Sequence, residues 1–380
     1  MRHTDLLVIG IVFLILAALP AVGAETWARV IGGPEYGALF DIVLCDDGQL
    51  LAVGATNHVH SPTREGDVLL IRLTIHGETL WERTWGGTEF EQAWAVAQAQ
   101  AGGFYVFGET ASLGTGGRDF FLLKIDENGS EEWVRTYGGA QREWPFGMLA
   151  LSNGDFLLYG STIREVGGRE ALYALRVAAD GEVVWEFFDE ADVDRFISDA
   201  TETPQSDLVL SAAGDNDGGL VKLTADGEVL WARTYELAES QYPTEVIQNG
   251  DGGFLLAGYY AGQASRQLAD VWLAGCSPSG QLEWQKTFGS RLLDDYALSL
   301  LRLANGSVLI GGFGSGMPLW CVSESGEILW ESRPMQSFTY GAFGLLEIPD
   351  GNLLISGMRM ISRSRDATIL RLSQAGQLAD

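Results

Sequence analysis

The chain has 380 residues, of which 46% are hydrophobic, and its 51 acidic and 24 basic residues give a formal net charge of −27. Such an acidic surface repels nucleic acid and anionic lipid, so we expect neither as a partner. The three cysteines, Cys45, Cys276 and Cys321, do not form the pattern of a disulfide framework, and we expect buried free thiols.

Residues 1–24 differ in composition from the rest of the chain. Arg2 precedes an apolar run over residues 6–19, and small residues at 22–24 follow it. This pattern predicts a cleaved signal peptide, and therefore a secreted protein in an extracellular or periplasmic compartment, without membrane contact after cleavage. The alternative is a retained anchor, because the apolar run is near the shortest length that spans a bilayer. The mature chain, residues 25–380, is expected to be one domain and a monomer.

Seven tryptophans then recur at intervals of 46 to 54 residues. A glycine stands four positions before each one from Trp81 onward, in segments such as ADGEVLW, and supplies the positive φ that a tight hairpin needs. Short apolar runs precede each hairpin. A repeat of this length, built of short strands, predicts the blades of a β-propeller. The tryptophans are Trp27, Trp81, Trp133, Trp185, Trp231, Trp284 and Trp330.

Each repeat is predicted to contain three strands followed by a fourth that carries the tryptophan, which makes a four-stranded antiparallel blade. Near the C-terminus, Gly376 begins another hairpin, but Asp380 stands where the tryptophan would fall. Residues 26–33 read as a fourth strand that lacks its own first three. We therefore expect Thr26 to Ile31 to pair with residues 367–372, so that the N-terminal strand closes an all-β, seven-bladed propeller.

The segment GTGGRDFFLLKIDENGSEEWVRTYGG (114–139) resembles the repeats of secreted bacterial and archaeal propeller proteins. Their units run roughly as D-x-x-L-x-K-x-D-x-x-G-x-x-x-W-x-x-T-Y-G-G, and the likeness covers nearly the whole mature chain. The G-x-x-x-W element is also distantly similar to the repeats of quinoprotein-type propellers. The resemblance implies a secreted or surface-attached propeller. It implies no reaction, because such repeat proteins generally lack an assigned activity.

Repeated positions are interpreted first as structure. We expect the seven tryptophans to pack one blade against the next, since each buries a large apolar area. Nine positions before four of them, and before Asp380, stands a basic residue. These residues are expected to form cross-strand pairs with acids such as Glu132, and not an anion-binding ring. They are Arg72, Lys124, Arg176, Lys222 and Arg371.

Functional side chains are expected where the blades differ. The loops that join second to third strands, and fourth strands to the next blade, should share one rim, and they vary in length, charge and aromatic content. Three acids of this rim lie ten residues after a tryptophan and are either solvated turn acids or part of a rim that suits a cation, a sugar or a basic peptide. The candidate ligand-binding residues are His58, His60, Glu91, Arg142, Glu143, Trp144 and Asp294.

The sequence contains no G-x-S-x-G elbow, no H-E-x-x-H motif and no phosphate-binding glycine loop. His58 and His60, with Glu65 and Asp67 nearby, fit a metal cluster only weakly, and a surface loop is the preferred interpretation. We therefore expect no metal and no cofactor, and predict a non-catalytic binding module for an unknown protein or glycan. The alternative is an extracellular polysaccharide hydrolase or lyase that uses rim or channel carboxylates.

Overall fold

The computed structural model describes residues 26–31, 36–56, 66–189, 194–214, 217–235, 240–261, 269–290, 294–335, 338–361 and 364–378. Within these ranges the chain forms 28 β-strands and no helix, and hence no helix that crosses a membrane. The predicted signal peptide, residues 1–24, lies outside the described residues, as do His58 and His60.

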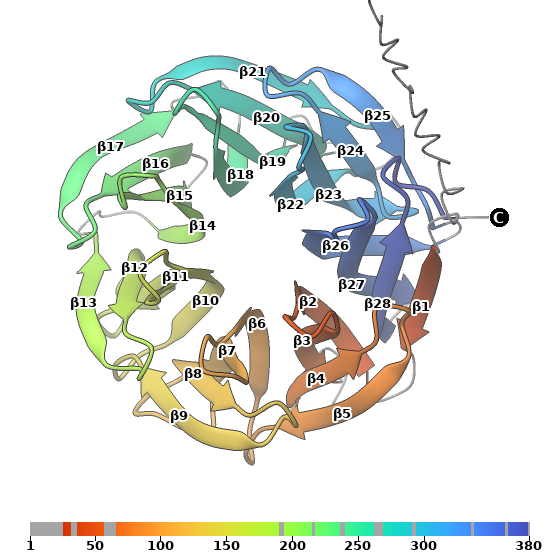
Figure 1. The fold of residues 1–380 in the computed structure, drawn as a ribbon. Coiled ribbons are helices and arrows are strands. Elements are labelled where there is room, and N and C mark those ends of the chain that lie inside the picture. Colours follow the sequence, from red (N-terminus) through yellow and green to blue (C-terminus); the bar gives the residue numbers. More distant parts are fainter. Residues whose placement is uncertain are drawn as a thin grey trace, which may run out of the picture.

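The strands group into seven antiparallel units of four, arranged around one axis (Figure 1). The first blade holds β2 (Tyr36–Leu44), β3 (Leu50–Thr56), β4 (Val68–Leu73) and β5 (Thr79–Trp85). The second holds β6 (Glu91–Gln98), β7 (Phe104–Thr110), β8 (Asp119–Ile125) and β9 (Glu131–Tyr137). The third holds β10 (Glu143–Ala150), β11 (Phe156–Ile163), β12 (Glu170–Val177) and β13 (Val183–Phe188). The fourth holds β14 (Arg195–Glu202), β15 (Leu208–Gly214), β16 (Asp217–Leu223) and β17 (Val229–Tyr235).

The fifth blade holds β18 (Ser240–Gln248), β19 (Phe254–Ala261), β20 (Asp270–Cys276) and β21 (Leu282–Phe288). The sixth holds β22 (Tyr296–Arg302), β23 (Val308–Ser315), β24 (Leu319–Val322) and β25 (Ile328–Ser332). The seventh holds β26 (Thr339–Glu347), β27 (Leu353–Ile361), β28 (Ser364–Leu372) and, from the other end of the chain, β1 (Trp27–Ile31). Five blades are separate sheets, whereas β23 also pairs with β26 and joins the sixth and seventh blades into one eight-stranded sheet. The sequence did not predict this link.

The N-terminal strand lies where the sequence placed it. β1 pairs antiparallel with β28, with Trp27 opposite Arg371 and Ile31 opposite Ala367. The indole Nε1 of Trp27 also donates a hydrogen bond of 3.3 Å to the carbonyl oxygen of Ile75 in the first blade. β1 therefore contacts the first blade as well as the seventh.

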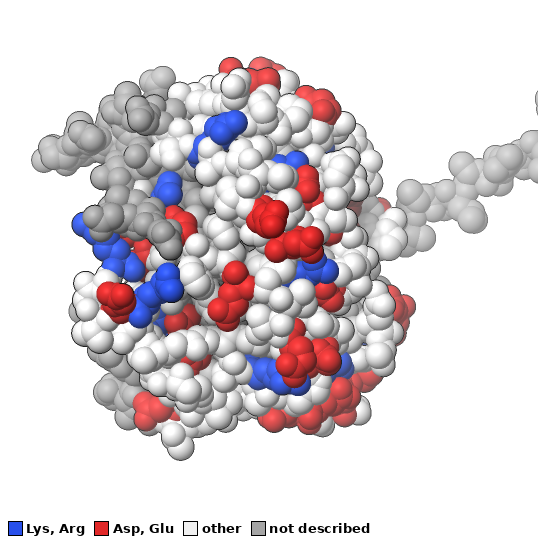
Figure 2. All heavy atoms as spheres, turned by 90° about the vertical axis from the view of Figure 1, so that its left-hand side faces the viewer, with Lys and Arg blue, Asp and Glu red and all other residues white. Residues whose placement is uncertain are grey.

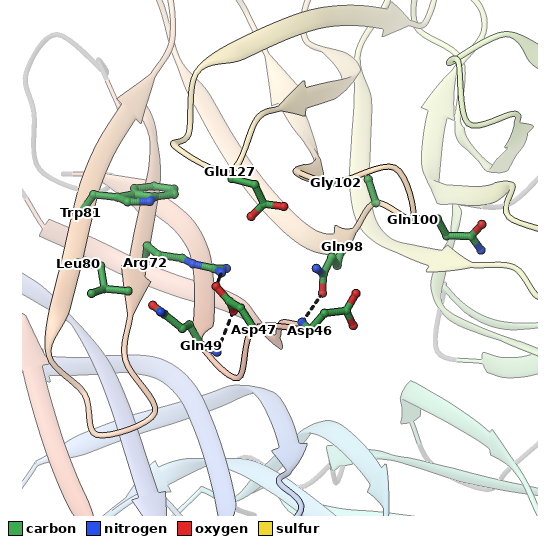
Figure 3. Close-up of a pocket in the computed structure, with 11 residues that line it drawn as sticks. Asp46, Asp47, Gln49, Arg72, Leu80, Trp81, Gln98, Gln100, Gly102 and Glu127 are labelled. Carbon is green, nitrogen blue, oxygen red and sulfur yellow. Dashed lines mark hydrogen bonds and ion pairs between the residues drawn. The ribbon is translucent and has the colours of Figure 1, made fainter.

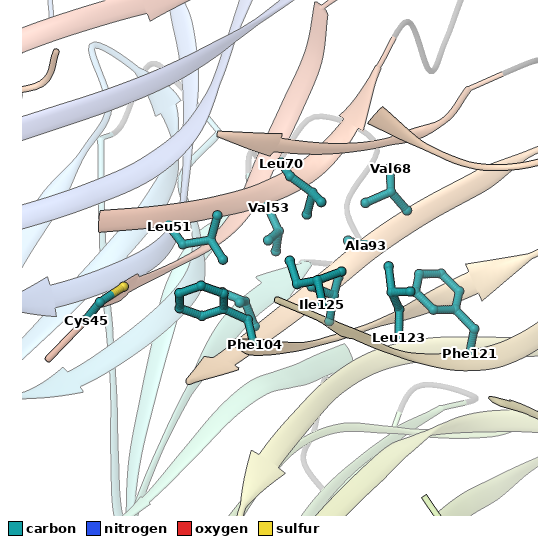
Figure 4. Packing of buried hydrophobic residues seen from close by; sticks show 12 residues of the cluster. Cys45, Leu51, Val53, Val68, Leu70, Ala93, Phe104, Phe121, Leu123 and Ile125 are labelled. Atoms are coloured by element: carbon teal, nitrogen blue, oxygen red, sulfur yellow. The ribbon is translucent and has the colours of Figure 1, made fainter. Parts of the chain in front are cut away.

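The hydrophobic core lies in layers between adjacent blades. Every residue of β4 (VLLIRL) and of β8 (DFFLLKI) is buried, because these middle strands are covered on both faces by neighbouring sheets. Figure 4 shows one such layer, in which Leu51 and Leu70 of the first blade meet Phe104 and Leu123 of the second. Full burial of one such side chain contributes about 1.5–3 kcal/mol relative to exposure. The outer strands, by contrast, have mostly exposed or half-buried side chains.

Each repeated tryptophan contacts the hairpin glycine of the next blade. A Cβ added to Gly280 would lie 2.6 Å from the ring of Trp231, and one added to Gly77 would lie 3.0 Å from Trp27. The same contact joins Trp330 to Gly376. The tryptophan thus occupies the space that a side chain at the glycine would need. This contact confirms the prediction that the tryptophans pack blade against blade.

The repeated basic residues pair within their own blades, as predicted. Lys124 lies 3.1 Å from Glu132, and Arg72 lies 2.7 Å from Asp47 at the turn between the first and second strands. Arg176, Lys222 and Arg371 pair with the corresponding turn acids Asp155, Asp207 and Asp350. The three cysteines are free and buried, as the sequence predicted. They are Cys45, Cys276 and Cys321.

Candidate functional site

The innermost strand of every blade carries a β-bulge at one shared position. In each, one residue is skipped in the register between the first and second strands, as Trp94 is between Ala93 and Ala95. An unpaired residue bends its strand and redirects its side chain. The seven skipped residues are Phe40, Trp94, Phe146, Ser198, Thr244, Leu298 and Phe343, one from each blade.

All seven bulge residues line one cavity of about 320 Å³. The strands that carry them are the innermost strands of the seven blades in Figure 1. This cavity is named the channel pocket. Phe196, Tyr242, Pro243, Glu245 and Tyr259 complete its lining. Phe196 and Tyr242 precede the bulges of β14 and β18, so the pocket extends from mid-channel toward the end at which the inner strands begin.

Aromatic rings form a continuous arc on one side of the channel pocket. The ring centroid of Phe40 lies 4.7 Å from that of Trp94 and 5.1 Å from that of Phe343. Trp94 lies 6.4 Å from Phe146, which in turn stacks on Phe196 at 4.7 Å with an interplanar angle of 11°. These separations are within the range of favourable ring–ring contacts. Ser198 and Thr244 add smaller, polar side chains to the lining, near Tyr242 and Tyr259.

Acids follow three of the bulges and join neighbouring blades. Asp41 accepts a hydrogen bond of 2.9 Å from the backbone N–H of Val96, and Asp199 accepts one of 2.8 Å from Val246. Glu245 accepts in the same manner from the backbone of Leu300. Each carboxylate thus satisfies a donor on the inner strand of the next blade, which a buried N–H requires.

Burial raises the pKa of Asp41 and of Asp199 to about 6, and it raises the pKa of Glu245 well above its usual range. The charges of Asp199 and Asp41 raise the pKa of Glu245 further. Protein atoms surround these carboxyls, each residue is half-buried as a whole, and Glu245 lines the channel pocket. Above pH 6, where Asp41 and Asp199 are ionised, the channel pocket therefore has negative potential beside its aromatic wall.

Replacing Asp199 with Asn is expected to stabilise the protein at pH 8 by about 1–3 kcal/mol and to leave it nearly unchanged at pH 4. The folded-state pKa, about 6, lies above the usual value of 3.8, so this carboxyl's contribution is complete below pH 3.8 and is lost as the pH rises through 6. In the wild type the Tyr159 hydroxyl donates to Asp199 at 2.9 Å; the Asn amide can still accept from Val246, and its NH₂ group can donate to the Tyr159 oxygen instead. Urea unfolding at both pH values measures the difference, with Asp226→Asn as the control at an exposed acid. Equal effects of the two substitutions would contradict the expectation.

The rim that carries the second-to-third-strand loops and the inter-blade loops is named the variable rim. The structure brings these loops together, since the N–H of Glu91 donates to Gly66 and that of Glu143 to Arg118. The Glu91 carboxylate is fully buried and accepts hydrogen bonds from Thr110 and the backbone N–H groups of Gly87 and Ser112. Glu91 was expected at the solvated surface of the rim. The structure corrects this expectation, because the buried carboxylate holds the loops together.

Glu143 is buried in the same manner. It accepts from the Thr162 hydroxyl at 2.8 Å, and burial raises its pKa to about 7. Asp294 is not the structural equivalent of Glu91 and Glu143. The sixth blade has one more residue before this position, so Asp295 makes the corresponding backbone hydrogen bond, to Ala269. Asp295 is fully buried and pairs with Arg333 at 2.9 Å, whereas Asp294 is exposed and accepts from the N–H of Ala269.

Arg142 and Trp144 are the predicted rim residues that lie together at a half-buried surface. The guanidinium carbon of Arg142 lies 4.2 Å from the centroid of the Trp144 ring, and a guanidinium nitrogen of Arg142 lies 3.5 Å from the Glu109 carboxylate. The structure thus brings together Arg142, Glu143 and Trp144 at the beginning of β10. It places Glu91 and Asp294 in other blades.

The opposite rim carries the Asp-Gly and Asn-Gly turns and is named the hairpin rim. A larger cavity of about 540 Å³ lies there between the first and second blades (Figure 3). Its charged groups are already engaged, since Arg72 pairs with Asp47 and the N–H of Asp46 donates to Gln98. A second cavity of about 460 Å³, lined in part by Glu347 and Asp350, recurs on the same rim. These hollows follow from the repeat, so we do not take them as the functional site.

On the face of the outer wall that Figure 2 shows, acidic and basic side chains lie side by side. This face therefore has no patch of a single charge sign that covers it. No group of three or more His, Cys, Asp and Glu residues suited to a metal ion occurs in the described part of the chain. The channel pocket is therefore the feature that sets this molecule apart from a bare propeller scaffold.

A family model described as outer membrane protein assembly factor BamB matches residues 64–250. No curated protein sequence matches the chain. Among solved structures, the one described as YCF48 bound to D1 peptide has a TM-score of 0.58 and 14% identity, and covers 92% of this chain and 95% of its own. The WD40 domain of Pan2 from Neurospora crassa has a TM-score of 0.57 and 10% identity, with 90% and 92% covered. Together these matches support a β-propeller fold, with a likeness to the BamB family model over residues 64–250.

An anionic quinone cofactor does not fit the channel pocket. Such a cofactor carries carboxylates that need cationic partners, and the lining contains Glu245 but neither lysine nor arginine among the described residues. Two carboxylates brought together without a countercharge repel each other. We therefore derive no chemistry through a quinone in this protein.

Proposed function

We propose that this chain is an extracytoplasmic binding module whose ligand enters the axial channel from the variable rim. The observation that carries the proposal is the channel pocket, a concave, mostly aromatic cavity with a few polar groups in its lining. The predicted signal peptide and the match to an outer membrane assembly factor support a location outside the cytoplasm. The propeller described as bound to a peptide supports a binding role for this fold.

The variable rim forms the approach to this site in our proposal. Arg142 and Trp144 present a stacked cation and ring there, and Asp294 adds an exposed carboxylate. His58 and His60 remain part of the proposed face, although they lie outside the described residues. Glu91 and Glu143 support the loops from within. We also propose that the pairing of β1 with β28 closes the ring around the channel pocket.

Replacing Ser198 with Trp tests where the ligand binds. Ser198 holds the bulge position that Trp94 and Phe40 hold in other blades, so the fold accommodates an aromatic side chain there while the pocket is filled. Glycans and short peptides are screened by thermal shift, because a ligand of the native state raises its stability. A ligand that raises the midpoint of the wild type is expected to have no effect on Ser198→Trp.

The control for this experiment is Gln100→Arg, which alters the cavity on the hairpin rim. It is expected to leave the ligand-induced shift unchanged. A ligand that stabilises Ser198→Trp as strongly as the wild type, but fails to stabilise Gln100→Arg, would place binding on the hairpin rim and refute the proposal.

A second candidate function is hydrolysis of a polysaccharide by channel carboxylates. The observation that favours it is the raised pKa of Glu245 beside the charges of Asp199 and Asp41, since a general acid needs a carboxyl that stays protonated near neutral pH. Release of reducing ends from a polysaccharide panel, abolished in Glu245→Gln, would establish it. If no polysaccharide of the panel is cleaved, hydrolysis is excluded for these substrates and the binding function remains the proposal.

A further inference from the structure

We infer that the channel pocket binds an organic cation, an ammonium group that carries apolar substituents. This inference rests on the proposed function and names the ligand chemistry of the same site. The pocket combines an arc of aromatic faces with one carboxyl in its lining and two more beside that carboxyl. A desolvated cation over such faces is attracted by the negative potential of each ring face.

The rings of the arc are available for a cation from outside the protein. Elsewhere in the molecule, arginines cover aromatic faces, as Arg118 covers Phe90 at 3.9 Å and Arg164 covers Phe188 at 4.0 Å. In the described part of the chain, no arginine or lysine lies over the five rings of the arc, which are Phe40, Trp94, Phe146, Phe196 and Phe343. The arc is therefore a set of ring faces without an internal cation.

The charges around the pocket favour the same ligand class. Glu245 lines the pocket beside the carboxyls of Asp199 and Asp41, whose charges oppose its ionisation, so an added cation favours the ionised form of all three carboxyls. An anion meets the opposite field. The lining itself contains no lysine or arginine in the described residues that would neutralise these acids.

The polar groups of the lining favour an ammonium group over a sugar. The Thr244 hydroxyl lies 3.1 Å from the carbonyl oxygen of Ala257 and 3.0 Å from that of Ala297, and the Ser198 hydroxyl lies 3.3 Å from that of Ser211. The donor hydrogens of these two hydroxyls are therefore engaged by the backbone. A sugar needs several hydrogen-bonding partners, whereas an alkylated ammonium needs ring faces and negative charge.

The test compares choline with its neutral isostere, 3,3-dimethylbutan-1-ol, by titration calorimetry on the full mature chain. Choline is expected to bind at least tenfold more tightly than the alcohol. Glu245→Gln is expected to weaken choline at least fivefold and to leave the alcohol unchanged. Phe40→Leu keeps an apolar side chain but removes a ring face, and is expected to weaken choline more than the alcohol. Equal affinity for the two compounds would show a merely apolar pocket and overturn the inference.

Two further arms separate the remaining questions. A short peptide that contains trimethyllysine, bound tenfold more tightly than choline, would identify a protein side chain as the source of the ammonium group; the reverse order would identify a free small molecule. Ser198→Trp is expected to abolish both. If neither cation binds, but a neutral ligand from the thermal-shift screen is lost in Ser198→Trp, the cation inference fails while the binding site stands.

Discussion

Deletion of residues 25–33 is expected to lower the free energy of unfolding by more than about 5 kcal/mol, or to prevent folding. The deletion removes β1, exposes the edge of β28 over the five positions opposite Trp27 to Ile31, and removes the Trp27 ring from Gly77. The hydrogen bond from Trp27 to Ile75 is lost as well. Because β1 contacts both the seventh and the first blade, its loss weakens two interfaces at once. Urea unfolding followed by tryptophan fluorescence measures the effect.

The matched control replaces residues 57–65, another nine residues, which the sequence predicts as a loop between the second and third strands, with two glycines, since loops tolerate such changes far better than strands do. The single substitution Trp27→Ala is expected to cost about 2–4 kcal/mol, because a partly buried large ring is removed. An unfolding midpoint in the β1 deletion equal to that of the loop control would show that β1 does not close the ring.

Replacing Gly280 with Ala is expected to destabilise the protein by about 2–4 kcal/mol, more than the same change at most other turns. Gly280 has φ = +74°, which costs any residue with a Cβ, and the new Cβ would also lie 2.6 Å from the Trp231 ring. The ring cannot move aside freely, because it is part of the packing between blades.

Gly48→Ala isolates the two causes. Gly48 has φ = +76°, but a Cβ there would have no atom within 4 Å, so only the backbone cost of about 1 kcal/mol is expected. The difference between the two midpoints in urea measures the tryptophan contact. Equal destabilisation by the two substitutions would mean that the Trp–Gly contact contributes nothing.

The blade architecture could be predicted from the sequence because the repeat marks its own contacts. A tryptophan four residues after a turn glycine identifies the outer strand, and Trp27 without preceding strands identified β1 as the partner of β28. The link between β23 and β26 could not be predicted, since three backbone pairs at a strand end leave no pattern in the side chains.

The channel pocket escaped prediction because bulges have no periodic signal. A skipped residue shifts the alternation of inward and outward side chains by one, so Phe40 and Trp94 read as ordinary strand residues. One signal was present: a bulge residue followed by an acid recurs as Phe40-Asp41, Ser198-Asp199 and Thr244-Glu245.

Burial depth was the other quantity that the sequence did not reveal. Glu91 and Glu143 follow loops and so read as solvated acids, but their carboxylates accept the hydrogen bonds of those loops and are buried. Asp294 and Asp295 are adjacent in the sequence, and only the register of β22 decides which of them turns inward.

Anomalous scattering can locate a cation bound in the channel pocket directly. Crystals soaked in tetramethylarsonium, an arsenic analogue of a quaternary ammonium group, are expected to show one strong arsenic peak between the rings of Phe40, Trp94 and Phe146 and the carboxyl of Glu245. An arsenic peak confined to the hairpin rim, or no peak in crystals of the wild type at saturating concentration, would contradict the claim that the channel pocket is a cation-binding site.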